Sequence, residues 1–183
     1  MSFSFSEEGM FFIQNWGTIE KLLNSLQNFR SEFSNYLYSV EKMLKTKNWW
    51  SEEELVFRKR DQRQVYISKK GWSDDDITYY IWIGIEGFVP ESVLGTPDSA
   101  YCYLWVMTGS RANVILQELS TIFKDKEEFS DYFTNKKSNY ILKKPLRKYT
   151  EEEFQVFASA DPLQEIVDFM EKVYLTIIDY KIP

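Results

Sequence analysis

The sequence predicts an α+β fold in which helices pack on an antiparallel sheet of four to five strands. Three observations predict it: a helical repeat of apolar residues near the N-terminus, period-two alternation in the middle of the chain, and a second helical stripe at the C-terminal end. With 183 residues, 44% hydrophobic and 27% charged, the chain has the size and composition of one folded domain. We expect a single domain over 1–183, with a helical segment at 1–47, a sheet-containing core with inserted helices at 52–149 and C-terminal helices at 150–183.

The N-terminal segment predicts a long helix. Ser6 followed by Glu7 and Glu8 is typical of a helix start, because a serine caps the first turn and acids favour its positive end. Between residues 18 and 46, apolar side chains then recur three and four positions apart: Ile19, Leu23, Leu26, Phe33, Leu37, Val40 and Leu44. A helix of this length spans about 43 Å. The rest of the chain forms a body only about 30 Å across, so we expect part of the helix to overhang.

A second apolar set on this helix recurs every seven residues: Leu22, Phe29, Tyr36 and Met43. Two stripes are more than one flat contact requires. Two interpretations stay open at this point. The helix packs entirely within its own chain, with a bend at Gly17 or Arg30, or it pairs with a second copy to form a homodimer.

The middle of the chain predicts consecutive strands. Leu55–Arg60 and Gln64–Ser68 flank a short break, and Ile77–Phe88 alternates isoleucines with other residues. Ala100–Met107 follows after a segment, Pro90–Ser99, that is rich in turn residues. Because the connections are short, we expect an antiparallel meander.

Later segments predict an edge strand and several helices. The edge strand is Tyr140–Leu146, because a central strand poorly tolerates its proline. Helices are expected over 111–123 and 126–135, and a third after the capping box of Thr150 with Glu153. Asp161-Pro162 opens the last helix, whose apolar stripe is Leu163, Ile166, Val167, Met170, Val173, Tyr174 and Ile177.

Composition excludes most familiar catalytic chemistry. The chain has no histidine and one cysteine, which removes Ser-His-Asp and Cys-His catalysis, zinc sites that use histidine, and any internal disulfide. A lone cysteine fits a reducing compartment, and neither a signal peptide nor a membrane-spanning run is evident. We therefore expect a soluble, cytoplasmic protein without a cofactor or bound metal, and the composition favours a role that is not enzymatic.

Aromatic side chains give the first candidate site. If the aliphatic residues of the two central strands face the core, one set of aromatic residues shares the opposite face: Tyr80, Trp82, Tyr101, Tyr103 and Trp105. Tyrosine and tryptophan are frequent anchors of protein interfaces and also stack on nucleic acid bases. The alternative is a sheet with helices on both faces, in which these rings are core.

A basic run gives the second candidate site. Its members are Arg58, Lys59, Arg60, Arg63, Lys69 and Lys70. Basic residues interleaved with aromatic ones can bind a nucleic acid. Acids between them and a sequence pI near 4.9 weaken that hypothesis, and charged residues also protect exposed strand edges. Phosphates are expected at the aromatic residues only if this basic run folds over them.

Two further sites are weaker. Asp74–Asp76, Glu86 and Asp98 are the material for a carboxylate Mg²⁺ site, yet no lysine or arginine occurs between residues 73 and 110. A turn or a helix cap is the simpler interpretation of the three aspartates. Ser110 and Arg111 follow Gly109 at a strand-to-helix junction and could bind an anion, or Ser110 could serve as an ordinary cap. Cys102 is expected to be an inert core residue.

These observations predict a non-catalytic module for protein–protein interaction, in the manner of immunity proteins, antitoxins and phage-encoded inhibitors. This comparison rests on composition alone. The alternative is a protein that binds or processes nucleic acid through the basic 58–70 hairpin, and a third hypothesis is a Mg²⁺-dependent hydrolase.

Overall fold

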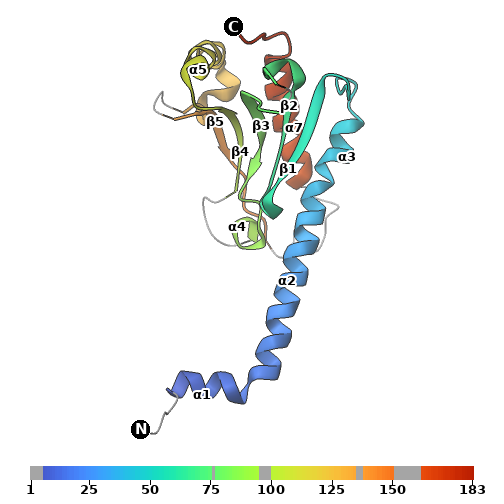
Figure 1. Cartoon of the computed structure of the whole chain (residues 1–183), viewed down its shortest axis with the longest axis vertical. Helices are drawn as coiled ribbons and strands as arrows, with labels where there is room; N and C mark the ends of the chain where they lie inside the picture. Colours follow the sequence, from blue (N-terminus) through green and yellow to red (C-terminus); the bar gives the residue numbers. More distant parts are fainter. Residues whose placement is uncertain (1–5, 76, 95–99, 135–137, 151–161) are drawn as a thin grey trace.

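The computed structural model describes residues 6–75, 77–94, 100–134, 138–150 and 162–183. Five strands form one sheet in the order of the sequence, and every neighbouring pair is antiparallel. The strands are β1 (Leu55–Arg60), β2 (Gln64–Lys69), β3 (Ile81–Glu86), β4 (Tyr101–Val106) and β5 (Tyr140–Pro145). The predicted α+β meander is therefore confirmed, with the proline-containing strand at an edge (Figure 1).

The pleat of the central strands separates two kinds of side chain. Ile83 of β3 pairs with Leu104 of β4, and both are fully buried on one face. The neighbouring pair, Trp82 and Trp105, points to the other face because successive side chains alternate across a strand. The sheet thus has an aliphatic face and an aromatic face.

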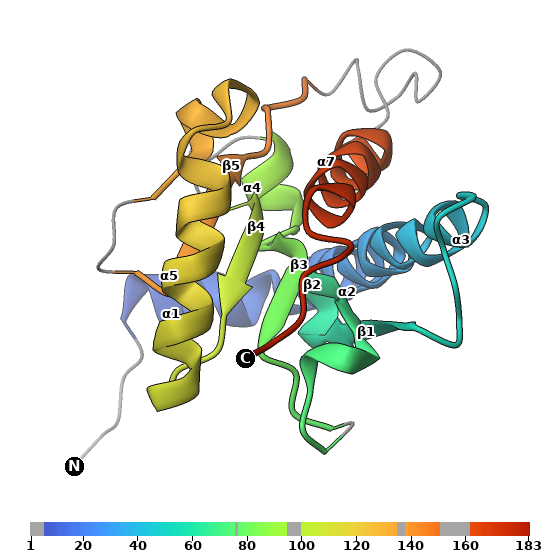
Figure 2. The same ribbon diagram turned by 90° about the horizontal axis from the view of Figure 1, so that it is seen from above.

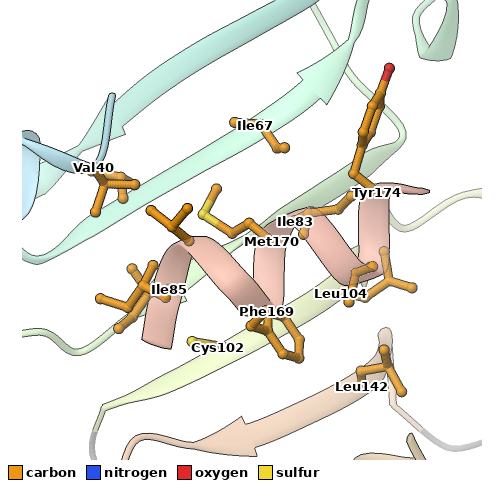
Figure 3. Close-up of a cluster of buried hydrophobic side chains, with 14 of the residues drawn as sticks. Val40, Ile67, Ile83, Ile85, Cys102, Leu104, Leu142, Phe169, Met170 and Tyr174 are labelled. Atoms are coloured by element: carbon orange, nitrogen blue, oxygen red, sulfur yellow. The ribbon is translucent and has the colours of Figure 1, made fainter. Parts of the chain in front are cut away.

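Helix α7 (Pro162–Thr176) covers the aliphatic face. The whole predicted stripe of this helix is buried, with no member more than 3% exposed. Figure 3 shows Met170 and Phe169 of the helix against Ile83, Ile85 and Leu104 of the strands. Its expected cap, Asp161, lies outside the described residues, as does Glu153 of the predicted capping box.

The N-terminal segment forms three consecutive helices, α1 (Glu7–Gln14), α2 (Trp16–Tyr38) and α3 (Val40–Lys45), and Figure 1 shows α1 turned sharply away from the direction of α2. The Ser6 hydroxyl accepts a hydrogen bond from the Gly9 amide, which confirms the predicted cap. The breaks fall at Asn15 and Ser39, whereas bends were expected at Gly17 or Arg30.

Only the C-terminal part of this segment packs on the body. Phe33 stacks on Phe88 with 4.7 Å between ring centroids, and Leu37, Val40 and Leu44 are buried beside α7. All residues from 20 to 32 are exposed, and Figure 1 shows α1 and the first half of α2 extending away from the sheet. Part of the N-terminal segment therefore overhangs the body, as predicted.

Helix α5 (Ser110–Lys124) confirms the helix predicted at 111–123, and its buried side chains join the same core as α7. The helix predicted at 126–135 is a short 3-10 turn, η3 (Glu127–Tyr132). Two further 3-10 turns are η1 (Asp61–Arg63) and η2 (Lys70–Trp72). Helix α4 (Pro90–Leu94) lies where only a turn was expected.

The described helices leave the aromatic face open. Helices α3, α5 and α7 contribute to the aliphatic core, and none of the described helices crosses the front of the sheet in Figure 1. Seen from above, α3 and α7 lie together on one side (Figure 2). The alternative of a sheet with helices on both faces is thus not what the described residues form. None of the helices in this part of the chain is long and apolar enough to cross a membrane.

Candidate binding site on the open face of the sheet

Alternate residues of four strands, with one residue before β3, build the aromatic face. We use this name for seven rings: Tyr66, Tyr79, Trp82, Tyr101, Tyr103, Trp105 and Tyr140. Tyr79 and Tyr103 are buried but do not belong to the aliphatic core cluster, and the other five rings are half-buried. The rings therefore pack together on a surface of their own.

Three of these rings form a stack across the middle strands. Tyr66 lies parallel to Trp82, with 4.4 Å between ring centroids and 7° between planes. Trp82 also contacts Trp105, with centroids 4.6 Å apart and planes tilted by 43°. Strand pairing places Trp82 directly opposite Trp105, and such cross-strand aromatic pairs stabilise a sheet. Trp82 therefore contacts an aromatic ring from each of its two neighbouring strands.

The tyrosines at the other end of the face surround Glu86. The hydroxyls of Tyr101 and Tyr140 each donate to the same Glu86 oxygen at 3.0 Å. Burial, reinforced by the hydrogen bond to Glu86, raises the pKa of Tyr101 well above its usual value. Burial also raises the pKa of Tyr103, whose hydroxyl accepts from the Gln64 side-chain amide at 2.7 Å. Two hydroxyl donors thus hold the Glu86 side chain in place.

Cationic side chains lie over several of these rings. The Arg60 guanidinium is 5.8 Å from the Trp82 ring centroid, and that of Arg58 is 6.0 Å from Tyr79. The Lys143 ammonium is 3.8 Å from the Tyr101 ring centroid. Such contacts favour a cation above an aromatic face. The aromatic face therefore has a basic rim, which consists of Arg58, Arg60 and Lys143. Phosphates were expected at these rings only if the basic run folded over them, and two arginines of that run do lie over them.

The predicted basic run is divided between two surfaces. Arg58 and Arg60 lie over rings of the aromatic face. Successive side chains alternate across a strand, so Lys59 between them points to the other face, toward α3. The three lysines contact other parts of their own chain. Lys59 pairs with Glu41, Lys69 with Glu54, and Lys70 donates to the Glu52 carbonyl. Only part of the run is therefore available at the candidate site.

A small hollow opens on this face between β2, β3, β4 and β5. Its volume is about 200 Å³. Its walls combine the tryptophans with charged residues: Arg60, Asp61, Arg63, Gln64, Trp82, Glu86, Tyr103, Trp105 and Tyr140. Sites for whole small molecules usually have volumes of about 300–1,000 Å³. The hollow therefore has the size of a receptor for one side chain.

Tyr80, which strict alternation assigns to the aromatic face, lies elsewhere. Its hydroxyl donates to Asp74, the Arg111 guanidinium is 5.6 Å from its ring centroid, and the ring packs on the aliphatic core. The regular alternation fails here because β3 begins only at Ile81, whereas a strand from Ile77 was predicted. Tyr79 occupies the aromatic face instead, and Ile77 is 80% exposed.

Tyr66 and Tyr140 were not among the predicted site residues. Both lie in segments that were predicted as strands, so the signal was present in the sequence. Pairing Tyr66 with Gly84 and Tyr140 with Trp105 across neighbouring strands brings them to this face. Finding them requires the strand register, which periodicity within one strand does not supply.

The weaker predicted sites have structural partners. The Arg111 guanidinium donates to the Pro183 carbonyl and pairs with Asp74, and Gly109 occupies the cap position before Ser110. Anion binding by Ser110 and Arg111 stays a prediction. Asp75 accepts from the amides of Ile77 and Thr78, and these bonds lower its pKa to about 2. This agrees with the simpler interpretation of a turn.

The carboxylates do not gather into a metal site within the described part of the chain. No group of three or more histidine, cysteine, aspartate or glutamate side chains is close enough there to hold an ion. Asp76 and Asp98 lie outside the described residues. Cys102 is fully buried among aliphatic side chains, and this burial raises the pKa of its thiol far above the usual value.

Comparison of the chain with models of protein families, with curated proteins and with solved structures finds no match in any of the three.

Proposed function

We propose that this protein is a non-catalytic protein-binding module whose contact surface is the aromatic face. The observation that carries the proposal is a preformed cluster of tryptophan, tyrosine and arginine side chains on a sheet face that no described helix covers. These three residue types are the most enriched at the energetic centres of protein interfaces. A regulator or inhibitor in the cytoplasm is the kind of protein that acts through such a surface alone.

The packing of the rings favours a protein partner over stacked bases. A base stacks on a free ring face, but Tyr66 already lies parallel to Trp82 at 4.4 Å, and Trp105 contacts the same ring. Rings fixed in this way offer their edges and outer surfaces to apolar side chains. The Glu86 carboxylate in the wall of the hollow also repels a phosphate.

The charges around the aromatic face indicate what kind of partner would fit it. Arg58, Arg60 and Lys143 surround the rings, although the chain as a whole carries a net charge of −6. A partner with acidic side chains at its rim and one protruding side chain for the 200 Å³ hollow complements this surface.

Single-stranded nucleic acid is the second candidate ligand. The specific observation in its favour is that Arg58, Arg60 and Lys143 share a face with seven aromatic rings. We do not propose the third hypothesis, a Mg²⁺-dependent hydrolase. Glu86 already accepts two tyrosine hydroxyls, and Asp75 is occupied by its turn.

The test is capture of partners from a lysate of the cells that produce the protein. Immobilised wild type is compared with Trp105→Ala and Arg60→Ala, which alter the centre and the rim of the face. Leu175→Ala is the control. Leu175 is an apolar side chain that is 46% exposed, but it lies on α7 and not on the aromatic face. Circular dichroism and the melting temperature verify that each variant is folded.

We expect one or more proteins to be retained by the wild type and by Leu175→Ala, and to be lost with both face variants. Retention by all four proteins contradicts the proposal. In parallel, fluorescent 20-nucleotide DNA and RNA strands are titrated at 50 and 200 mM salt. Tight binding that falls steeply with salt and disappears in Arg60→Ala would replace the protein partner by a nucleic acid.

A further inference from the structure

The N-terminal arm, which we define as residues 7–29, exposes more apolar surface than a separate helix in water normally has. Nine large side chains in it are between 40% and 65% exposed: Met10, Phe11, Phe12, Ile13, Trp16, Leu22, Leu23, Leu26 and Phe29. At roughly 200 Å² each, they leave on the order of 900 Å² of apolar surface in contact with water. The largest patch on a typical monomer is about 300–600 Å². Each partner of a standard interface buries about 800 Å².

The spacing of these residues is that of a helix-pairing seam. Ile19, Leu22, Leu26 and Phe29 alternate steps of three and four residues, as positions a and d of a heptad repeat do. The stripe continues into the body at Phe33, whose ring lies 6.0 Å from that of Phe29 and stacks on Phe88. One half of a continuous seam is thus packed on the sheet body, whereas Leu22, Leu26 and Phe29 of the other half are exposed in the described chain.

Helix α1 needs cover on more than one side. Met10, Phe11, Phe12 and Ile13 are consecutive, so they point in all directions around the helix. A helix that is apolar all round is normally buried.

Charge favours a second copy of the chain over a lipid surface as the occupant. Glu20 and Lys21 are the only charged side chains between residues 9 and 29. Helices that lie on membranes carry many lysines and arginines on their polar face, which this arm lacks, and Glu7 and Glu8 add negative charge beside its aromatic residues. Two copies of an uncharged apolar seam can pair without bringing like charges together.

We propose that the arms of two chains pair antiparallel around a two-fold axis near Asn24. The seam reads the same in both directions about this residue, so Ile19 meets Phe29 of the partner and Leu22 meets Leu26. The two bodies, each in a chain of net charge −6, then lie at opposite ends of the pair. A parallel pair would place them side by side. In the antiparallel register the start of α2 reaches the level at which the partner's arm joins its body, so each α1 gains a second surface to pack against.

The test is the mass of the full-length protein in solution, measured by sedimentation equilibrium over roughly 1–100 μM. Wild type is compared with the double variant Leu22→Glu/Leu26→Glu. The control is Asn24→Glu/Gln27→Glu, which adds the same charge to the polar face of the same helix. All four positions are exposed in the single chain, so we expect these substitutions to leave the fold of the body unchanged.

We expect wild type and the control to sediment at twice the chain mass of 21.9 kDa, and the Leu22→Glu/Leu26→Glu protein to sediment as a monomer. A monomeric wild type overturns the proposal, whether or not it binds phospholipid vesicles in a parallel flotation assay. A dimer that survives the double substitution overturns it as well.

Orientation is tested by spin labels at an introduced cysteine, Ser31→Cys, since the natural Cys102 is fully buried. Residue 31 lies seven positions from the axis, so an antiparallel pair separates the two labelled backbones by about 21 Å along the helices. A parallel pair brings them to about 10 Å. The short distance contradicts the antiparallel register. Because the arm and the aromatic face share no residue, neither result depends on the proposed function.

Discussion

At the scale of single residues, Gly84 allows strands β2 and β3 to approach closely beneath the aromatic face. It lies on β3 between Tyr66 and Tyr103 of the neighbouring strands. A Cβ atom at this position would be 2.2 Å from the Val65 carbonyl oxygen and 2.7 Å from the Tyr66 Cβ. Because the first of these atoms is backbone, the strand itself would have to move. A glycine inside a strand often marks such a close approach.

Gly84→Ala should therefore destabilise the protein by about 1–3 kcal/mol or more, as overpacking of a filled site does. Gly71→Ala is the matched control, because no heavy atom lies within 4 Å of the added methyl group there. Chemical denaturation of both variants measures the difference. Equal stability of the two would show that β2 and β3 are not packed as described.

A second residue, Asp75, shapes the chain just before β3. Its carboxylate accepts from two backbone amides, and its pKa is lowered from 3.8 to about 2. A group whose pKa is lower in the folded state stabilises the fold above the pKa of the unfolded chain, and this contribution is lost as the pH falls toward 2.

Asp75→Asn keeps the acceptor oxygen but removes the titration. Urea unfolding of the wild type and of Asp75→Asn should therefore differ most above pH 4, and the difference should shrink between pH 4 and pH 2. A difference that stays constant over this range would show that the carboxylate is not held by the turn in its charged form.

At the scale of elements, the parts of the fold that depend on side-chain periodicity were predictable. The stripe of α7 and the alternation of β4 were read correctly, because one face of each element is buried and the period survives in the sequence. The start of β3 was not. The turn at Asp75 and the residues after it occupy positions 77–80, which were predicted as strand, and alternation then assigns Tyr80 to a face that Tyr79 occupies.

How the elements pack against one another could not be predicted from the sequence. Whether helices cover one face of the sheet or both depends on where the connections run, and aromatic residues suit either a core or an interface. Likewise, Arg58 and Arg60 join the aromatic face while Lys59 turns to Glu41, which follows only once the register of β1 with β2 is known. The predicted residues of the candidate site therefore include Trp82, Tyr101, Tyr103 and Trp105, but the joining of its basic rim to these rings was not predicted.

At the scale of the whole molecule, the two unpartnered surfaces lie apart. The aromatic face belongs to the sheet, and the arm extends away from the body in Figure 1. An antiparallel dimer of arms would carry two aromatic faces at opposite ends. Such a dimer could bind a partner that presents two sites more tightly than either face binds one, because the second contact becomes intramolecular.

We infer that the aromatic face is a surface and not a second core. Trp72 provides the comparison, because it is 1% exposed and its indole N–H donates to the Tyr180 carbonyl within the aliphatic core. The most direct test is the free energy of unfolding of Trp105→Ala and Trp72→Ala, measured by urea denaturation of each protein without any partner. We expect a loss of about 3–5 kcal/mol for Trp72→Ala and only about 1 kcal/mol for Trp105→Ala, because Trp105 is only half-buried. Equal losses for the two tryptophans would contradict it.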